Sequence, residues 1–357
     1  MPDSRRQPAP NPVVASDFDL DGAFFFPGPD GVPIPVIGAG DVTRQLPGTP
    51  TRLLASVVPI LRRQGDVVTA EGTAFAISQC GLYLTARHCV FPGQGYPPDD
   101  EYDEAVGELF ILPIDQSESV VRVNHRGLRV TGISYFGGQS DLALLQVDMS
   151  NWPGLFPEGP EPIPLSTNEV RVGTHCAALG FGEMQIGEVV SFGDGGVTYA
   201  GMGPLHASEG FVEAVLPEGR DRTLIGYPCV QVGTTCPQGM SGGPVFREDG
   251  SVIGVVSRGL DGIESAPVEY FALHGPIASL GIPRRELRGQ RVTVADFVIK
   301  GRIRTHGFQR YEIIPKGDHA RVAWSVPSNR RLPQDFKRSA KAAPQQRHGT
   351  RKRGTRR

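Results

Sequence analysis

Short apolar, β-branched runs separated by turn residues dominate the chain between residues 52 and 285. Examples are LLASVVPIL at 53–61, LYLTARH at 82–88 and SVIGVVSRG at 251–259. Turn signals recur about every 8–12 residues, a spacing typical of β-sandwiches and β-barrels. The 46 glycines and 32 prolines favour the same turn-rich architecture and argue against a helical bundle. The sequence therefore predicts an all-β fold.

The proline-rich stretch 151–165 divides this series of strands into two halves. We expect one domain at 51–285, built of two packed barrels at about 52–150 and about 165–285.

Three further segments flank the predicted domain. Residues 1–50 are rich in Pro, Gly and Asp, and are either a disordered arm or an extended segment that docks Phe24–Phe26 on the body. Residues 286–328 alternate in a strand-like way and predict a β-rich extension. Residues 329–357 contain few large apolar side chains and predict a disordered basic tail.

The net charge of -2 combines an acidic body with a basic tail, because residues 330–357 hold eleven Lys and Arg and one Asp. Such a tail is expected to attract nucleic acid, an acidic partner or an anionic membrane surface nonspecifically. The alternative is a solvated tail with no dedicated partner.

No run approaches the ~18 apolar residues of a transmembrane segment, and the first residues lack the apolar core of a signal peptide. Five cysteines are a low and odd number for a disulfide framework. We therefore expect a cytoplasmic protein, and export by another route stays open.

Ser241 lies in the sequence QGMSGGP at 238–244. A serine hydroxyl becomes a strong nucleophile only when a base takes its proton and hydrogen-bond donors stabilise the oxyanion that forms. Gly239 allows a tight turn, so that the amides of Gly239 and Ser241 point at one spot. The alternative is a glycine-rich turn without chemistry.

His88 ends an apolar strand in TARHC, and Asp141 begins another in SDLALL. The near-neutral pKa of histidine suits a group that acts first as a base and then as an acid. A carboxylate at the start of an apolar strand costs desolvation energy unless it is paired, and a histidine ring would pair with it. Each residue alone is equally explained by a structural role. Their order, with His88 and Asp141 in the first half and Ser241 in the second, predicts a cleft between the barrels.

These motifs resemble those of the trypsin/chymotrypsin-fold serine peptidases, in particular the bacterial HtrA-like and glutamyl-endopeptidase-like branch. TARHC is similar to the family's T-A-A-H-C, DLALL to D-I/L-A-L-L, and GMSGGPVF to G-D/N-S-G-G-P. VGTHCAALGFG at 172–182 is similar to a V-G-x-x-V-x-A-L/I-G segment of the HtrA-like branch. The resemblance covers about residues 52–285 and implies two packed six-stranded antiparallel β-barrels.

The resemblance also implies a serine endopeptidase that hydrolyses protein or peptide substrates through an acyl-enzyme, with no metal or organic cofactor. It assigns Ser241 as the nucleophile, His88 as the base and then the acid, and Asp141 as the group that orients His88. The amides of Gly239 and Ser241 would form the oxyanion hole. Substrate binding is assigned to Thr235, Ser257, Arg258 and Gly259.

Departures from the family pattern narrow these expectations. Thr235 stands where a preference for Lys or Arg would need an aspartate, so that preference is not supported. Residue 73 is Thr where the family has the disulfide partner of Cys89, so we expect Cys89 to be a free, buried thiol. Whether Cys229 and Cys236 pair across a loop stays open.

Two other functions remain as alternatives. The first is a catalytically inactive, peptidase-like module that binds partners through the cleft or the basic tail. The second is a hydrolase that associates with nucleic acid through residues 330–357.

Overall fold

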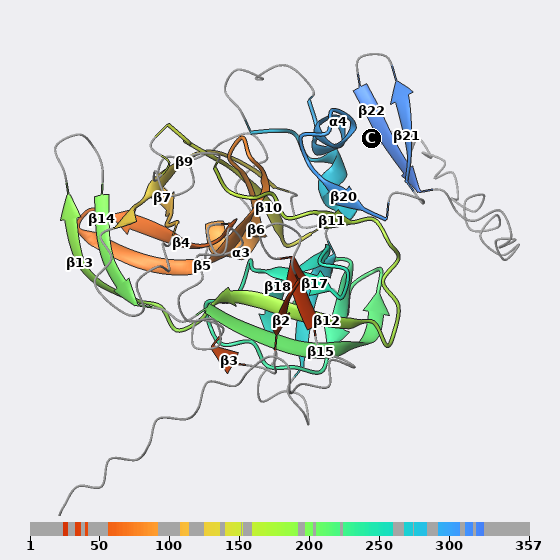
Figure 1. Cartoon of the computed structure of the whole chain (residues 1–357), viewed down its shortest axis with the longest axis horizontal. Coiled ribbons are helices and arrows are strands. Elements are labelled where there is room, and N and C mark those ends of the chain that lie inside the picture. The colour runs from red at the N-terminus through yellow and green to blue at the C-terminus, as the bar shows by residue number, and fades with distance from the viewer. Residues whose placement is uncertain are drawn as a thin grey trace, which may run out of the picture.

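A computed structural model shows a molecule built mostly of β-strands, with few helices (Figure 1). The description covers residues 24–27, 33–36, 40–41, 56–91, 108–113, 125–135, 140–150, 152, 159–191, 197–202, 205–221, 224–259, 268–273, 275–283, 292–307, 311–316 and 319–324.

Six antiparallel strands close into a first barrel, which we call barrel one. In pairing order they are β10 (Leu142–Val147), β6 (Leu82–Ala86), β5 (Val67–Ser78), β4 (Val57–Gln64), β7 (Glu108–Ile111) and β9 (Leu128–Tyr135). The ring closes because β9 pairs with β10 as well as with β7. The short helix α3 (Arg87–Val90) follows β6 directly.

A second ring, which we call barrel two, lies within a nine-stranded sheet. Its strands are β17 (Pro244–Arg247), β12 (His175–Phe181), β15 (Leu205–Leu216), β16 (Cys229–Val232), β19 (Glu269–Leu273) and β18 (Val252–Gly259). The additional pairing of β17 with β18 closes this ring. The prediction of two six-stranded antiparallel barrels is therefore confirmed, and Figure 1 shows barrel one above barrel two.

Shorter elements flank the two barrels. β11 (Leu165–Ser166) and β20 (Thr305–His306) add parallel strands beside β18. A small sheet joins β13 (Gln185–Ser191), β14 (Val197–Met202) and β8 (His125–Arg126), and two hairpins are formed by β1 (Phe24–Pro27) with β2 (Pro33–Val36) and by β21 (Tyr311–Lys316) with β22 (His319–Trp324). The remaining elements are β3 (Gly40–Asp41), the 3-10 helix η4 (Gly275–Ser279) and α4 (Val294–Ile299).

Thr293 explains why α4 begins where it does. Its side chain accepts a hydrogen bond from the Asp296 backbone N–H, while the Asp296 carboxylate accepts one from the Thr293 N–H. This reciprocal capping box satisfies two amide groups that a helix start otherwise leaves without a partner.

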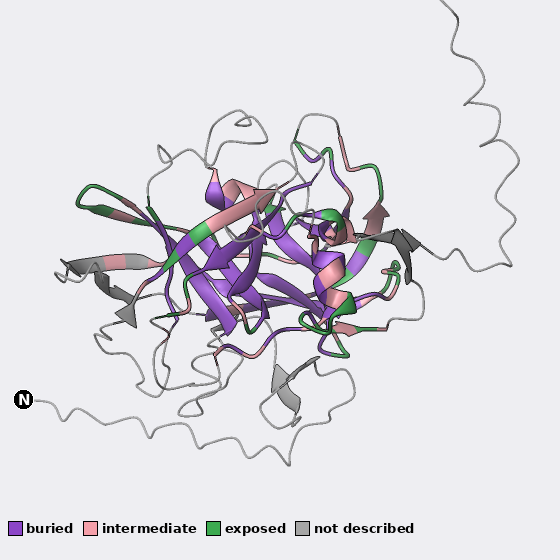
Figure 2. Cartoon of the chain, turned by 90° about the horizontal axis from the view of Figure 1, so that it is seen from above, coloured by how far each residue is buried: buried purple, intermediate pink, exposed green. Residues whose placement is uncertain are grey.

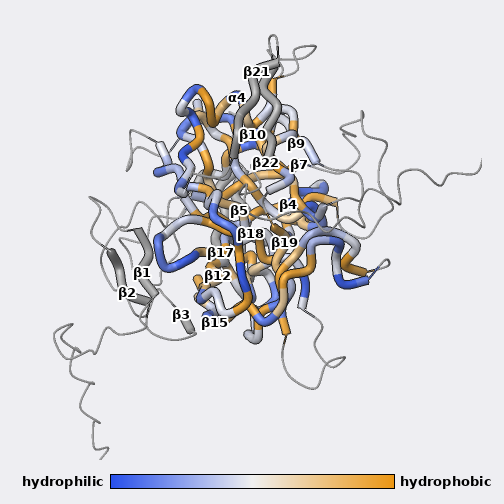
Figure 3. The backbone as a smooth tube through the Cα atoms, turned by 90° about the vertical axis from the view of Figure 1, so that its right-hand side faces the viewer, coloured by the Kyte–Doolittle hydropathy of each residue, from blue (hydrophilic) through white to orange (hydrophobic). Residues whose placement is uncertain are grey.

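The two barrels share one apolar core. Phe75 and Leu84 of barrel one belong to the same buried cluster as Phe181 and Phe246 of barrel two. The buried strands lie in the centre of Figure 2, and hydrophobic stretches run along the strands through the middle of Figure 3. Burying each such side chain contributes roughly 1.5–3 kcal/mol, so the shared core holds the barrels, and the residues at their seam, in fixed positions.

Several predictions from the sequence fall largely outside the described residues. They are the contacts of the Phe24–Phe26 side chains, the basic tail at 329–357 and the limits of the domain. In the first 50 residues the described backbone includes β3, which pairs with β15. Among the residues that the structure describes, no helix has the length and apolar character to cross a membrane.

We expect Tyr83→Phe to stabilise the protein. Tyr83 on β6 is fully buried, and its hydroxyl has no hydrogen-bond partner within the described part of the chain. A buried hydroxyl without a partner costs about 1–3 kcal/mol, so its removal should raise the free energy of unfolding by roughly 1 kcal/mol in urea denaturation. Tyr270→Phe is the matched control, because the Tyr270 hydroxyl donates to Gln231 Oε1 at 3.3 Å and its loss should destabilise. A destabilised Tyr83→Phe protein would contradict the description of Tyr83.

Candidate active site

The residues predicted from the sequence lie at the seam between the barrels. His88 is in α3, directly after β6, and Asp141 directly precedes β10. β6 and β10 are neighbours in barrel one, with Leu142 opposite Ala86, so the two side chains leave the barrel at the same end. Ser241 comes from barrel two, three residues before β17.

His88 and Asp141 form a hydrogen-bonded pair. His88 Nδ1 lies 2.7 Å from Asp141 Oδ2, and the His88 backbone N–H donates to Asp141 Oδ1 at 3.2 Å. Because an ionised carboxylate can only accept, the pairing places the ring proton on Nδ1 and leaves Nε2 as an acceptor. The Asp141 side chain is 5% exposed and the His88 side chain 30%, so the carboxylate is sealed while the ring stays accessible.

The environment raises the pKa of His88 and lowers the pKa of Asp141. Burial alone would lower the pKa of His88, but the hydrogen bond to Asp141, the neighbouring Cys89 and the Asp141 charge together raise it above its ordinary value. Burial alone would raise the pKa of Asp141, but the hydrogen bond and charge of His88 and the hydrogen bond from Ser257 lower it. Asp141 therefore stays ionised, and His88 accepts a proton readily.

Barrel one anchors the main chain of Ser241. The Thr73 N–H donates to the Ser241 carbonyl at 2.7 Å, and Cys89 Sγ donates to the same oxygen at 3.4 Å. Ser241 thus lies against the residue that follows His88. Its hydroxyl donates to the Ser257 carbonyl at 3.4 Å, and within the described residues no hydrogen bond joins Ser241 Oγ to the His88 ring.

Two amides beside Ser241 are available to bind an oxyanion. Within the described chain, neither the Gly239 N–H nor the Ser241 N–H donates a backbone hydrogen bond. The Gln238 carbonyl accepts from the Glu183 N–H at 2.8 Å, and in a trans peptide the Gly239 N–H must then point the opposite way. The Thr73 hydroxyl holds the Gly239 carbonyl at 3.0 Å, which fixes the next peptide as well.

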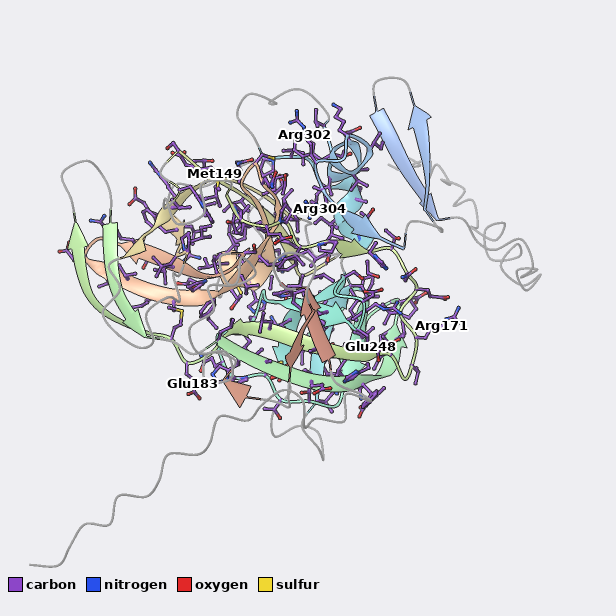
Figure 4. All side chains as sticks on the ribbon, viewed as in Figure 1. Met149, Arg171, Glu183, Glu248, Arg302 and Arg304 are labelled. Carbon is purple, nitrogen blue, oxygen red and sulfur yellow. The ribbon has the colours of Figure 1, made fainter. Side chains whose placement is uncertain are left out.

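Glu183, labelled in Figure 4, lies two residues after the end of β12. Its φ of 50° makes it the one non-glycine residue with a positive φ in the described chain. Such a conformation costs on the order of 1 kcal/mol and needs support from its surroundings, here including the bond to Gln238. No motif in the sequence indicated this residue.

Ser257 and Tyr227 extend the hydrogen-bond network into barrel two. Ser257 Oγ donates to Asp141 Oδ2 at 2.5 Å, and the Tyr227 hydroxyl contacts Ser257 Oγ in turn. Ser257 was assigned to substrate binding from the resemblance. The structure places its side chain against Asp141, and its role in binding a substrate stays a prediction. Nothing in the sequence indicated Tyr227.

The other predicted substrate-binding residues are placed around this network. Arg258 and Gly259 follow Ser257 on β18 and are exposed, as is Thr235. The Thr235 carbonyl accepts a hydrogen bond from Ser208 Oγ at 2.7 Å. Their roles in binding stay predictions.

The cysteines near the site are thiols. Cys89 is free and 1% exposed, which confirms the expectation that followed from threonine at position 73. Cys229 is also a free thiol, so it does not pair with Cys236. In the part of the chain that the structure describes, no group of three His, Cys, Asp or Glu side chains is placed to hold a metal ion.

We expect Gly239→Ala to lower kcat for peptide hydrolysis by roughly 10²–10³ with little change in KM, the effect of losing one oxyanion donor. Gly239 has φ +101°, and a Cβ there would lie 2.8 Å from the Phe181 carbonyl oxygen, so alanine must displace the peptide. Gly65→Ala is the matched control, because Gly65 also has a positive φ but has nothing within 4 Å of a Cβ. Equal kinetics in the two variants would contradict this role of Gly239.

The two closed barrels and the polar cluster at their seam define a double-barrel protein of the kind found in peptidases. The family model of the trypsin-like peptidase domain matches residues 72–255, more than half of the chain. The chain therefore belongs to the trypsin-like peptidase domain family. Its place in the HtrA-like branch stays a prediction.

Other comparisons give weaker similarities. No curated protein matches the chain. The active form of the Rv3671c protease from M. tuberculosis shares 19% identity at a TM-score of 0.42, covering 77% of this chain and 92% of that one. The inactive form of the same protease shares 20% identity at a TM-score of 0.39, covering 68% and 94%. The family assignment rests on the match over residues 72–255.

Proposed function

We propose that the protein is a serine endopeptidase that hydrolyses peptide bonds through an acyl-enzyme on Ser241. The observation that carries this proposal is the hydrogen-bonded His88–Asp141 pair beside Ser241, next to two amides that have no backbone acceptor within the described chain. Membership of the trypsin-like peptidase family supports a protein or peptide substrate.

The first half of the reaction forms the acyl-enzyme. Rotation of the Ser241 side chain moves Oγ from the Ser257 carbonyl toward His88 Nε2, the ring nitrogen left free by Asp141. Nε2 takes the hydroxyl proton as Oγ bonds to the scissile carbonyl carbon, and the carbonyl electron pair moves onto its oxygen. The Gly239 and Ser241 amides stabilise that oxyanion. His88 then donates the proton to the leaving amine as the C–N bond breaks.

The second half releases the acid. A water molecule takes the place of the departed amine and loses a proton to His88 Nε2 as it attacks the acyl carbon. The bond to Ser241 Oγ then breaks, and His88 returns the proton to that oxygen. Asp141 remains ionised throughout, since its task is to hold the ring and stabilise the imidazolium.

One observation favours the alternative of an inactive binding module. The Ser241 hydroxyl donates to Ser257, and within the described residues it makes no hydrogen bond to His88. A serine fixed in that orientation would leave the cleft able to bind a peptide without cleaving it. The 3.4 Å contact is a weak restraint, so the peptidase is the better-supported function.

A fluorophosphonate probe separates these two functions, because it reacts only with a serine that a neighbouring base activates. The wild-type protein should be labelled on Ser241, and Ser241→Ala should not be labelled. Ser279→Ala is the control, because Ser279 lies in η4 and its hydroxyl bonds locally to the Pro276 carbonyl. Folded wild-type protein that takes no label would favour the binding module.

A further inference from the structure

The hydrogen-bond chain that begins at His88 does not end at Ser257. It continues from Ser257 Oγ to the hydroxyl of Tyr227. We propose that Tyr227 is a positioning residue. Its hydroxyl keeps the Ser257 hydroxyl donating to Asp141, and this donation weakens the hydrogen bond between Asp141 and the protonated His88 ring. This inference rests on the proposed function, because it assigns His88 as the base.

The direction of each proton in this chain follows from the charge at its end. Asp141 is ionised and can only accept, so the single hydroxyl proton of Ser257 must be donated to Asp141 Oδ2, 2.5 Å away. Ser257 Oγ can then only accept from its other neighbour, and Tyr227 is the donor. Burial raises the pKa of Tyr227, which keeps its hydroxyl protonated for this task.

The Asp141–Ser257–Tyr227 hydrogen-bond chain is shielded from water, and neighbouring main-chain contacts hold Tyr227 in place. Ser257 is 1% exposed and Tyr227 is 7% exposed, so solvent does not compete for these bonds. The Leu273 N–H holds the carbonyl of Pro228, the residue after Tyr227, at 3.0 Å. Gly219, with φ +86°, packs closely behind, since a Cβ there would lie 2.7 Å from the Tyr227 nitrogen.

Tyr227 and Ser257 belong to barrel two, whereas Asp141 and His88 belong to barrel one. Through this hydrogen-bond chain, residues of barrel two influence the charge on Asp141 and the pKa of His88 in barrel one. The titratable and charged groups that act on the members of this hydrogen-bond chain are His88, Cys89, Asp141, Tyr227, Cys229 and Arg258. Among these, Tyr227 reaches the carboxylate through one intervening hydroxyl.

Hydrogen bonds in series strengthen one another, because each donor polarises the next. Donation from Tyr227 makes the Ser257 hydroxyl a better donor, which draws charge from Asp141 Oδ2, the oxygen that also holds His88 Nδ1. Without the Tyr227 hydroxyl, Asp141 should hold the protonated ring more tightly. The titration midpoint of His88 should then rise.

The test is an NMR titration of the His88 ring in the full-length protein, with the signal assigned by a His88→Gln variant. Tyr227→Phe should raise the midpoint by roughly 0.3–0.7 pH unit, and Ser257→Ala by roughly 1 unit. The double variant should shift no further than Ser257→Ala, because Tyr227 acts through Ser257. Tyr83→Phe, a buried tyrosine elsewhere, should leave the midpoint unchanged.

An unchanged midpoint in Tyr227→Phe, or additive shifts in the double variant, would overturn the inference and leave Tyr227 a packing role. If Tyr227→Phe does not fold, a ring-fluorinated tyrosine at position 227 provides a second test. Its stronger donor should lower the midpoint, and a rise would overturn the inference. The titration needs no turnover, so a protein that shows the shift but takes no fluorophosphonate label would disprove the proposed function alone.

Discussion

If the proposed function holds, Ser241→Ala is expected to lower kcat for peptide hydrolysis by roughly 10⁶-fold, the size of loss seen when a serine protease is deprived of its nucleophile. The physical reason is that Ser241 contacts Cys89, the residue after His88, and lies two residues after Gly239, so its hydroxyl is placed near both the base and the amides. The variant should fold normally, because Thr73 and Cys89 bond the main chain of Ser241, and among the described residues its hydroxyl makes a single weak contact. Progress curves with a peptide substrate give the rate, and thermal unfolding gives the stability.

The stability measurement is what makes this result interpretable. An inactive variant with an unchanged unfolding temperature identifies Ser241 as the nucleophile. A folded Ser241→Ala protein that keeps more than a small fraction of the wild-type rate would place the chemistry elsewhere.

Asp141→Asn is expected to lower kcat by roughly 10⁴-fold while leaving the local shape intact. An asparagine amide can donate to His88 Nδ1, which would move the ring proton to Nε2, where the base must accept. Steady-state kinetics across a pH series measures the effect. A loss of less than tenfold would show that Asp141 does not fix the state of the ring.

The same pH series tests the sign of the His88 shift. His88 must be neutral to act as a base, so kcat/KM should fall as the pH drops through its pKa, with a midpoint above the ordinary value of about 6.5. Removing the Asp141 charge should move this midpoint to lower pH. A midpoint that moves upward in Asp141→Asn would contradict the assigned pairing.

The sequence alone was sufficient to predict the two barrels, and it singled out His88, Asp141 and Ser241, which the structure brings to the seam between them. Strand periodicity and turn residues are local signals, and each of the three residues sits at a strand end or tight turn within a short motif. Cys89 was predicted as a free thiol because residue 73, where the family has the cysteine that pairs with it, is a threonine.

The supporting contacts could not be predicted, because they join residues far apart in the chain. The Thr73 hydroxyl meets Gly239 across 166 positions, and Ser257 meets Asp141 across 116. Tyr227 and Glu183 lie at bends between strands and belong to none of the sequence motifs described above. Their roles depend on how one barrel docks against the other, which no local pattern encodes.

The most direct test is to trap the covalent intermediate. Rapid-quench mass spectrometry with a slowly deacylating ester should show a burst of about one leaving group per protein, and one acyl group on the peptide that contains Ser241. Hydrolysis without a burst and without this adduct, or an acyl group on a different residue, would contradict the account.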